Sequence, residues 1–182
     1  GVEDQPRAES RAALAELQAL DARMKTVMLT GDHRHVAESV AAQIGGLDEV
    51  RAGLLPEDKL GVIRQLQAEG PVAMVGDGIN DAPALAQADI GIAMGGGGTA
   101  QAMETADVVL MQDNLHSIPL VLRVSRQTRR VVQQNITLSL VLKLAVLGLA
   151  IPGIASLWLA VLADVGATLI VTLNGMRLLR AR

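Results

Sequence analysis

Two long apolar runs near the end of the chain constrain its fold more than any other feature. Residues 136–154 are 19 residues with one charge, Lys143, and residues 157–173 are 17 residues with one charge, Asp164. A helix needs roughly 20 apolar residues to cross a bilayer, with about 17 at the low end. The runs therefore predict two transmembrane helices within residues 135–179, with a lipid bilayer around them. A buried helical hairpin in a soluble core is the alternative.

The charges outside these runs predict how the hairpin is oriented. The turn at Pro152-Gly153 is uncharged, whereas arginines flank both outer ends of the hairpin. These arginines are Arg129, Arg130, Arg177, Arg180 and Arg182. By the positive-inside rule, both outer ends face the cytosol and the turn lies outside. Residues 180–182 are then a cytosolic tail, and the chain before the hairpin is cytoplasmic.

Before residue 115 the chain is charged and alternates short apolar runs with helical patterns. The apolar runs, which predict strands, are residues 26–29, 72–75, 90–93 and 108–110. The helical patterns cover residues 7–20, residues 35–44 and a stretch that starts at Pro56. Strands that alternate with helices of this length indicate an α/β fold with a parallel sheet covered on both faces. Residues 115–134, which hold four arginines, are expected to form a basic connector helix.

Composition excludes some kinds of site. The chain has no cysteine, which excludes disulfides and thiolate metal ligands within these residues. Its net charge is -3, so nothing in the composition indicates a nucleic-acid partner. Trp158 is the only aromatic residue, so the core must be built from Ala, Leu, Val, Ile and Met.

Two of the predicted strands end in Gly-Asp, at Asp32 and Asp77. In an open parallel sheet, ligands bind beyond the carboxyl ends of the strands. After Asp77, either Asn80 or Asp81 can cap the next helix, with Pro83 in its first turn. Asp77 and Asp81 lie close together on one loop, and two such carboxylates suit a hard cation such as Mg²⁺. The alternative is that both acids only cap turns.

Three segments resemble, in order and approximate spacing, the phosphorylation domain of P-type ATPases, which has the haloacid-dehalogenase fold. They are Thr30-Gly31-Asp32, Pro56 to Lys59, and the octapeptide from Gly76 to Pro83. The similarity continues through residues 91–95 and 104–107 into the hairpin. The resemblance implies a Rossmannoid parallel sheet in residues 1–114, as the C-terminal half of that domain. It also implies ATP-driven ion transport through an aspartyl-phosphate.

The resemblance gives roles to residues at the strand ends. Thr30 and Lys59 would contact the phosphoryl group, and Gly31 and Asp32 would form and support the loop at the nucleotide-facing edge. Asp77 would hold Mg²⁺, while Asn80 and Asp81 would complete that end of the site. A Lys and a cation suit this task because a phosphoryl group in transfer carries negative charge.

Several parts of the family pattern do not occur in the chain. The phosphorylated aspartate lies in an Asp-Lys-Thr-Gly-Thr motif, which is missing, as are the nucleotide-binding insertion, the actuator motif and the membrane Cys-Pro-Cys. The chain is therefore expected to be a C-terminal part that works with the missing N-terminal part of the same pump. ATP would be bound mainly by those other regions, and the chain alone would not turn ATP over. A smaller departure is residues 95–100, where the family commonly has an Asp after the Thr.

His33 and His35 invite a metal-site interpretation, which their spacing does not favour. Residues two apart on a helix point to different faces, and this is poor for chelation. We expect both to be solvent-facing residues at a helix start.

The membrane charges predict which ion is carried. At about 1.5 Å per residue, Lys143 and Asp164 lie roughly 10 and 13 Å from the cytosolic ends of their runs, so they can meet across the hairpin. Asn135, seven residues, Lys143, and then Asp164-Val165-Gly166 resemble the zinc, cadmium and lead branch of the heavy-metal pumps. Asp164 is a sensible ligand for a divalent cation, with Lys143 as charge partner. A structural ion pair is the alternative for these two residues.

Three other functions compete with this one. A copper pump would need soft sulfur ligands, and Met176 lies near the end of the hairpin and not at its centre. A non-catalytic accessory short form would be a protein of a different class. A soluble haloacid-dehalogenase phosphatase is disfavoured by the hairpin and by the missing nucleophile. The resemblance favours a multi-pass protein of the bacterial plasma membrane.

Overall fold

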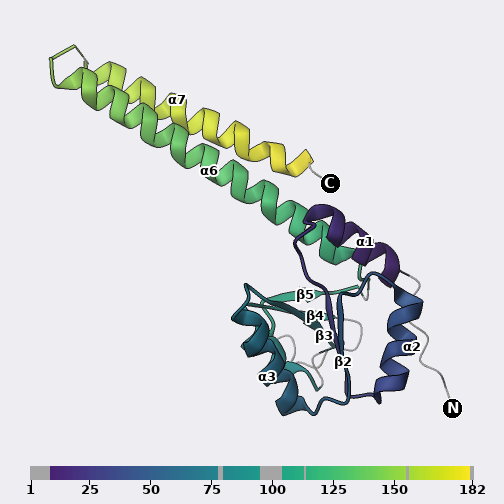
Figure 1. Cartoon of the computed structure of the whole chain (residues 1–182). Coiled ribbons are helices and arrows are strands. Elements are labelled where there is room, and N and C mark those ends of the chain that lie inside the picture. The colour runs from purple at the N-terminus through teal and green to yellow at the C-terminus, as the bar shows by residue number, and fades with distance from the viewer. Residues whose placement is uncertain (1–8, 78–79, 95–103, 113, 155, 181–182) are drawn as a thin grey trace. The chain divides into compact units, whose positions relative to one another are not determined.

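The computed structural model describes residues 9–77, 80–94, 104–112, 114–154 and 156–180. The chain divides into two compact units, Gly1–Pro119 and Leu120–Arg182 (Figure 1). The Gly-rich segment at residues 95–100, where the sequence departs from the family pattern, lies outside the described residues. The sequence predicts four segments, with boundaries after residues 114, 134 and 179, and these boundaries stay predictions.

The first unit alternates helices and strands, as the sequence predicts (Figure 1). Helix α3 begins at Pro56, whose fixed φ suits the first turn, and the Asp58 carboxylate accepts the Leu55 N–H at 2.9 Å. The helices are α1 (Ser10–Leu20), α2 (Arg34–Ile44), α3 (Pro56–Gln67) and α4 (Ala82–Gln87). The strands are β1 (Val27–Leu29), β2 (Glu49–Arg51), β3 (Ala73–Gly76), β4 (Ile90–Met94) and β5 (Val108–Leu110).

All strand pairs in the described residues are parallel, which confirms the expected sheet type. Strand β1 pairs with β2, with Met28 opposite Val50, and β3, β4 and β5 form a second group in that order. Strand β2 was not predicted from the sequence. Its three residues hold a single apolar side chain, Val50, between Glu49 and Arg51, so it gives no apolar run.

An aspartate placed just before a strand anchors the neighbouring strand in each pair. Asp48 precedes β2 and accepts the Thr26 N–H at 2.7 Å, and Asp89 precedes β4 and accepts the Val72 N–H at 2.8 Å. Asp107 precedes β5 and accepts the Gly91 N–H at 2.8 Å. Each carboxylate thus satisfies a backbone donor at the amino end of the sheet and fixes the start of the strand register.

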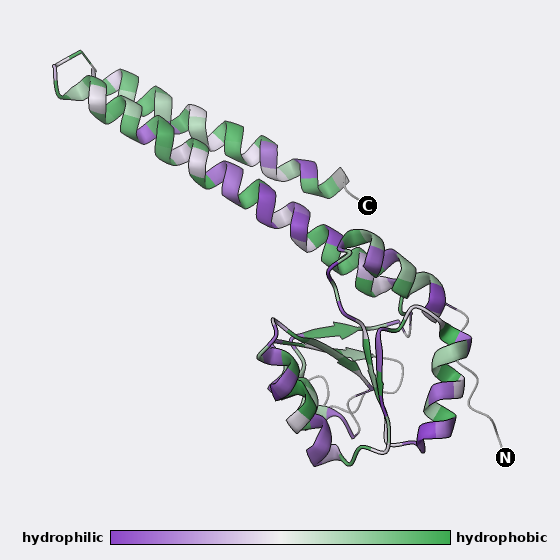
Figure 2. Ribbon diagram, viewed as in Figure 1, coloured by the Kyte–Doolittle hydropathy of each residue, from purple (hydrophilic) through white to green (hydrophobic). Residues whose placement is uncertain are grey.

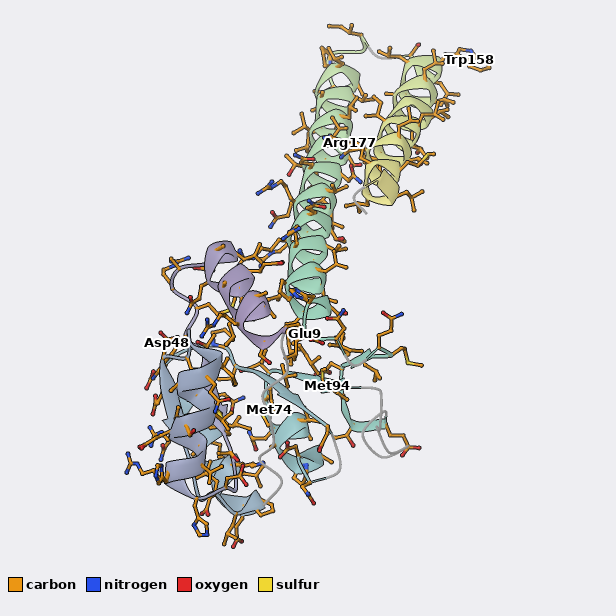
Figure 3. The ribbon with its side chains drawn as sticks, turned by 90° about the vertical axis from the view of Figure 1, so that its right-hand side faces the viewer. Glu9, Asp48, Met74, Met94, Trp158 and Arg177 are labelled. Atoms are coloured by element: carbon orange, nitrogen blue, oxygen red, sulfur yellow. The ribbon has the colours of Figure 1, made fainter. Side chains whose placement is uncertain are left out.

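The core of the first unit is small and contains no aromatic side chain. Helices α3 and α4 pack with β3 and β4 through buried aliphatic residues, and Leu29 of β1 packs against the same cluster. The buried members of the cluster are Ile63, Met74, Ala84, Leu85 and Ala93. Met74 and Met94 mark two neighbouring strands in Figure 3. Gly91 is required here because a Cβ at this position would lie 2.7 Å from the Leu85 carbonyl oxygen.

The second unit is a pair of long helices joined by a short turn. Helix α6 (Ser117–Ala150), which starts in the first unit, is continuous, so the expected connector and the first apolar run are parts of one helix. Helix α7 (Leu157–Met176) covers the second run and ends in a short 3-10 helix, η1 (Arg177–Arg180). Ser156 caps α7, because its Oγ accepts the Leu159 N–H at 3.3 Å.

Both helices are long and apolar enough to cross a membrane. Their surfaces are largely hydrophobic, with polar bands in α6 before residue 136 and at the end of α7 (Figure 2). In the most apolar window of each helix, 0% and 6% of the residues are buried. A core helix of a soluble protein would be mostly buried, so the structure favours a transmembrane hairpin over a buried one.

We predict that acid weakens the first unit through Asp48 and Asp89. The backbone N–H of Thr26 and that of Val72 hold the pKa of these carboxyls below the ordinary value. A lowered folded-state pKa means that the stabilisation is present above the unfolded pKa and is lost as the pH falls through the folded one. The melting temperature should therefore decrease once the pH is lowered below about 4. Circular dichroism of the chain in detergent, recorded across this range, checks it.

Asp48→Asn should lower the melting temperature at neutral pH and make its decline in acid shallower. Glu57→Gln, at an exposed first-turn position of α3, is the matched control. An unchanged acid profile in Asp48→Asn would contradict the role given to Asp48.

Candidate functional site at the carboxyl ends of the strands

The loop after β1 is held by hydrogen bonds among its own residues and to the segment before α3. The Thr30 hydroxyl donates to the Asp32 carboxylate at 2.9 Å, and the Asp32 N–H donates to the Thr30 hydroxyl at 3.1 Å. The N–H groups of Gly53 and Leu54 donate to the carbonyls of Asp32 and Thr30, at 2.8 and 3.0 Å. The predicted Thr-Gly-Asp residues therefore form one loop that is tied to the entry into α3.

Lys59, in the first turns of α3, reaches across to the N-terminus of α4. Its Nζ lies 2.5 Å from Oδ1 of Asp81, and the two side chains are only 13% and 16% exposed. The prediction that Asp81 can cap α4 is wrong in one respect. Asp81 occupies the N-cap position, but its side chain makes no capping hydrogen bond and pairs with Lys59 instead. The residues are 22 apart, so no local pattern indicated this ion pair.

Gly76 makes room for this ion pair. A Cβ at residue 76 would lie 2.9 Å from Oδ2 of Asp81, closer than real Cβ atoms approach a neighbour, and a tight 3.0 Å from Cβ of Asp81. The last residue of β3 must therefore lack a side chain if Asp81 is to keep its place. Asp77 follows directly at the carboxyl end of the strand.

The remaining predicted residues of this loop lie at the surface. Asp77 and Asn80 are exposed, and residues 78–79 between them lie outside the described part of the chain. Thr30 directly follows β1, Asp77 directly follows β3, and Asp81 directly precedes α4. Within the described residues, no three His, Cys, Asp or Glu side chains come together as a metal site.

The two histidines near the first loop are placed as expected. His33 is the N-cap residue of α2, His35 lies in its first turn, and both are exposed. The metal-site interpretation gains no support from their positions.

A second polar site lies in the hairpin. Nζ of Lys143 on α6 is 4.0 Å from Oδ1 of Asp164 on α7, so the two charges meet as predicted. A cavity of about 120 Å³ opens beside them, and its other lining residues are apolar. These are Leu142, Val146, Ala160, Ala163 and Ala167. Lys143 and Asp164 are 71% and 70% exposed, so other protein segments or ions could reach them.

A polar contact between the two helices was not predicted from the sequence. Nδ2 of Asn174 donates to Oδ1 of Asn135 at 2.8 Å. The sequence pattern singles out Asn135 only by its spacing to Lys143, and no motif includes Asn174. One sequence feature could have indicated Asn174, because it is a polar residue at the end of an otherwise apolar run.

Comparisons with known proteins agree with this arrangement. Residues 1–89 match the family of haloacid dehalogenase-like hydrolases. Over all 182 residues, the chain is 52% identical to a probable cadmium-transporting ATPase of Listeria monocytogenes, of which it covers 25%. It is 48% identical to the zinc/cadmium/lead-transporting P-type ATPase of Escherichia coli, over 100% of this chain and 24% of that protein.

A solved structure of a zinc-transporting PIB-type ATPase in the E2.Pi state also matches. It superposes with a TM-score of 0.89 and 48% identity, over 97% of this chain and 28% of that one. The likeness therefore includes both the first unit and the hairpin helices.

The strand-end loops and the matched family define a haloacid dehalogenase-like domain, followed here by two apolar helices. Because the similarity runs along the whole chain, the chain belongs to the P-type ATPases. It spans about a quarter of the length of these relatives.

We predict that Gly76→Ala disrupts the Lys59–Asp81 pair. The added methyl group must displace the Asp81 backbone or side chain, which should lower the free energy of unfolding by about 1–3 kcal/mol. Chemical denaturation of the first unit measures the change. Gly70→Ala is the matched control, because a Cβ there meets nothing within 4 Å. Equal stabilities of the two variants would contradict the steric argument.

Proposed function

We propose that the chain is the C-terminal quarter of an ATP-driven pump that moves a divalent heavy metal across a membrane through an aspartyl-phosphate. Zinc, cadmium and lead are the candidate ions. The observation that carries the proposal is the Lys143–Asp164 contact at 4.0 Å beside a cavity in an apolar hairpin. Charged residues inside membrane helices are costly and mark ion pathways unless they only pair with each other.

The first unit would supply half of the phosphorylation site. Lys59 is held by Asp81 with its ammonium group near the ends of β3 and α4, where it can balance the charge of a transferring phosphoryl group. The Thr30 hydroxyl, on the neighbouring loop, would donate to a phosphoryl oxygen in place of Asp32. Thr30, Gly31, Asp32, Lys59, Asn80 and Asp81 are the residues to which we give catalytic roles.

The chemistry of the donor set fits Mg²⁺, which P-type ATPases generally use together with ATP. Asp77 and Asp81 offer carboxylate oxygens on one loop, and hard oxygen ligands suit this ion. One Asp81 oxygen, Oδ1, faces Lys59, and Oδ2 faces the backbone at Gly76. Asp77, at the surface, is therefore the main ligand that we assign, and Asp81 is the second. When bound, Mg²⁺ would neutralise phosphate charge.

The hairpin would supply part of the ion pathway. Asp164 offers an anionic oxygen to a divalent cation, whereas Lys143 can only compensate charge. When the cation leaves, the ammonium group 4.0 Å away can neutralise the carboxylate. We assign binding to Asp164 and release to Lys143.

The proposal gives the protein a membrane location and further partners. The hairpin would lie in the bilayer of a multi-pass protein, in the bacterial plasma membrane, with the first unit in the cytoplasm. The remaining parts of the pump, outside these residues, would supply the phosphorylated aspartate and most contacts to ATP.

We predict that Asp77→Asn in the full-length pump lowers phosphoenzyme formation by at least about 100-fold, because a group that stabilises phosphoryl charge is lost. Radiolabelled phosphate incorporation measures it. Glu57→Gln, an exposed acid in α3, should incorporate phosphate normally. Wild-type incorporation by Asp77→Asn would show that the magnesium assignment is wrong.

We also predict that Asp164→Asn removes zinc-stimulated ATPase activity, since it keeps size and one oxygen but loses the negative charge. Lys143→Ala should weaken or uncouple the activity. Thr172→Ala is the matched control, because its hydroxyl bonds within α7, to the Thr168 carbonyl at 2.8 Å.

Full zinc transport by Asp164→Asn would make the carboxylate structural and remove the main support for the proposed ion. Stronger stimulation of the wild-type ATPase activity by copper than by zinc would also contradict the proposed ion.

A further inference from the structure

The two helices of the hairpin meet along a seam of residues at helical spacing. On each helix the least exposed side chains recur at intervals of three and four residues, which places them on one face. At the end of the seam away from the turn, these residues are Asn135, Leu138 and Leu142 on α6 and Ala167, Val171 and Asn174 on α7. An asparagine thus closes the seam on both helices.

The two asparagines form an interhelical amide clamp, by which we mean Asn135, Asn174 and the hydrogen bonds between their helices. Nδ2 of Asn174 donates to Oδ1 of Asn135 at 2.8 Å, and Nδ2 of Asn135 donates to the Val171 carbonyl at 3.4 Å. Nδ2 of Asn174 also donates to Oε1 of Gln134 at 3.5 Å. Hydrogen bonds therefore cross the seam in both directions.

The oxygens of the clamp already have donors. Oδ1 of Asn135 accepts from Asn174, and Oδ1 of Asn174 accepts from the Arg177 guanidinium at 3.2 Å. Arg177 is the C-cap residue of α7 and is labelled in Figure 3. A cation would have to displace an amide or a guanidinium and would lie next to a positive charge. This arrangement suits a structural contact and not a cation ligand.

We propose that the amide clamp fixes the axial register of α6 against α7 and thereby holds Lys143 opposite Asp164. The consequence for the ion site rests on the proposed function, whereas the register of the two helices does not depend on it. An apolar seam with small residues on one helix fits several registers about equally well, whereas a partly buried amide pair fits one.

The distances along the helices show why register matters. At about 1.5 Å per residue, the clamp lies roughly 12 Å from Lys143 along α6 and roughly 15 Å from Asp164 along α7. A slip by one helical turn would move the helices by about 5.4 Å. Because Nζ and Oδ1 are already 4.0 Å apart, such a slip would separate the charges. Asn135 and Asn174 are therefore positioning residues for the ion site.

A cross-linking ladder in membranes tests the register without any transport. The 182-residue chain has no cysteine, so introduced cysteines are the only thiols. Leu142→Cys is combined in turn with Ala160→Cys, Ala163→Cys or Ala167→Cys, all at positions that line the same cavity. One pair should dominate in the parent chain. Asn135→Leu or Asn174→Leu should lower its yield relative to the other pairs by at least about threefold, as expected when one or more interhelical hydrogen bonds are lost.

Two further variants show whether the amide is responsible. Gln133→Leu, an exposed amide on the same turn of α6, should leave the ladder unchanged. Asn135→Gln, which keeps the amide, should restore part of the preference. The clamp is disproved if the ladder of Asn135→Leu and Asn174→Leu matches that of the parent chain.

A functional measurement in the full-length pump tests the consequence. The clamp variants should raise the half-saturating zinc concentration about threefold, because only the fraction in the correct register binds. Phosphoenzyme formation from inorganic phosphate, which depends on the first unit, should not change. A lost ladder preference with an unchanged zinc response would overturn the link to the ion site. A pump without zinc response would contradict the proposed function, and the ladder alone would then decide the clamp.

Discussion

The ion pair between Lys59 and Asp81 is the contact on which the loop region of the first unit depends. It joins the start of α3 to the start of α4 and lies beside the end of β3, so three elements share it. Both partners are mostly shielded from water, and removal of one would leave an uncompensated charge in a half-buried place. Gly76 and Gly91 allow the close approaches that the pair and the helix packing need. A small aliphatic core is sufficient here because polar contacts fix its edges.

The hairpin, which we propose to lie in a bilayer, depends on polar contacts for a related reason. Its seam is apolar, and lipid is as apolar as the side chains, so burial alone gives the two helices little reason to choose one alignment. Polar contacts provide that choice at one end, and a charge pair lies further along toward the turn. The Lys143–Asp164 contact would contribute little to holding the helices in one alignment, since both groups are well exposed and their distance is at the limit for an ion pair. It is better suited to a group that exchanges partners.

Periodicity and strand-end motifs predict most of the fold, and they fail where a structure depends on distant partners. Pro56, the apolar runs and the Gly-Asp ends locate helices, strands and loops correctly because each signal is local. Strand β2 escapes prediction because it has one apolar residue and gains its hydrogen bonds from β1. The partner of Asp81 escapes as well, since its own neighbours favour a cap and Lys59 is 22 residues away. The roles of the site residues stay predictions, because geometry alone does not show chemistry.

The presence of a single aromatic residue has a spectroscopic consequence. Trp158 is the only aromatic side chain in the chain, and it lies at the turn end of α7, 77% exposed and pointing away from the helices (Figure 3). Ultraviolet fluorescence therefore reports on one end of the hairpin and on nothing in the α/β unit. Transfer of that end from water to a lipid interface would shift the emission to shorter wavelength, while unfolding of the sheet would leave it unchanged. A single intrinsic fluorophore thus separates insertion from folding without any added label.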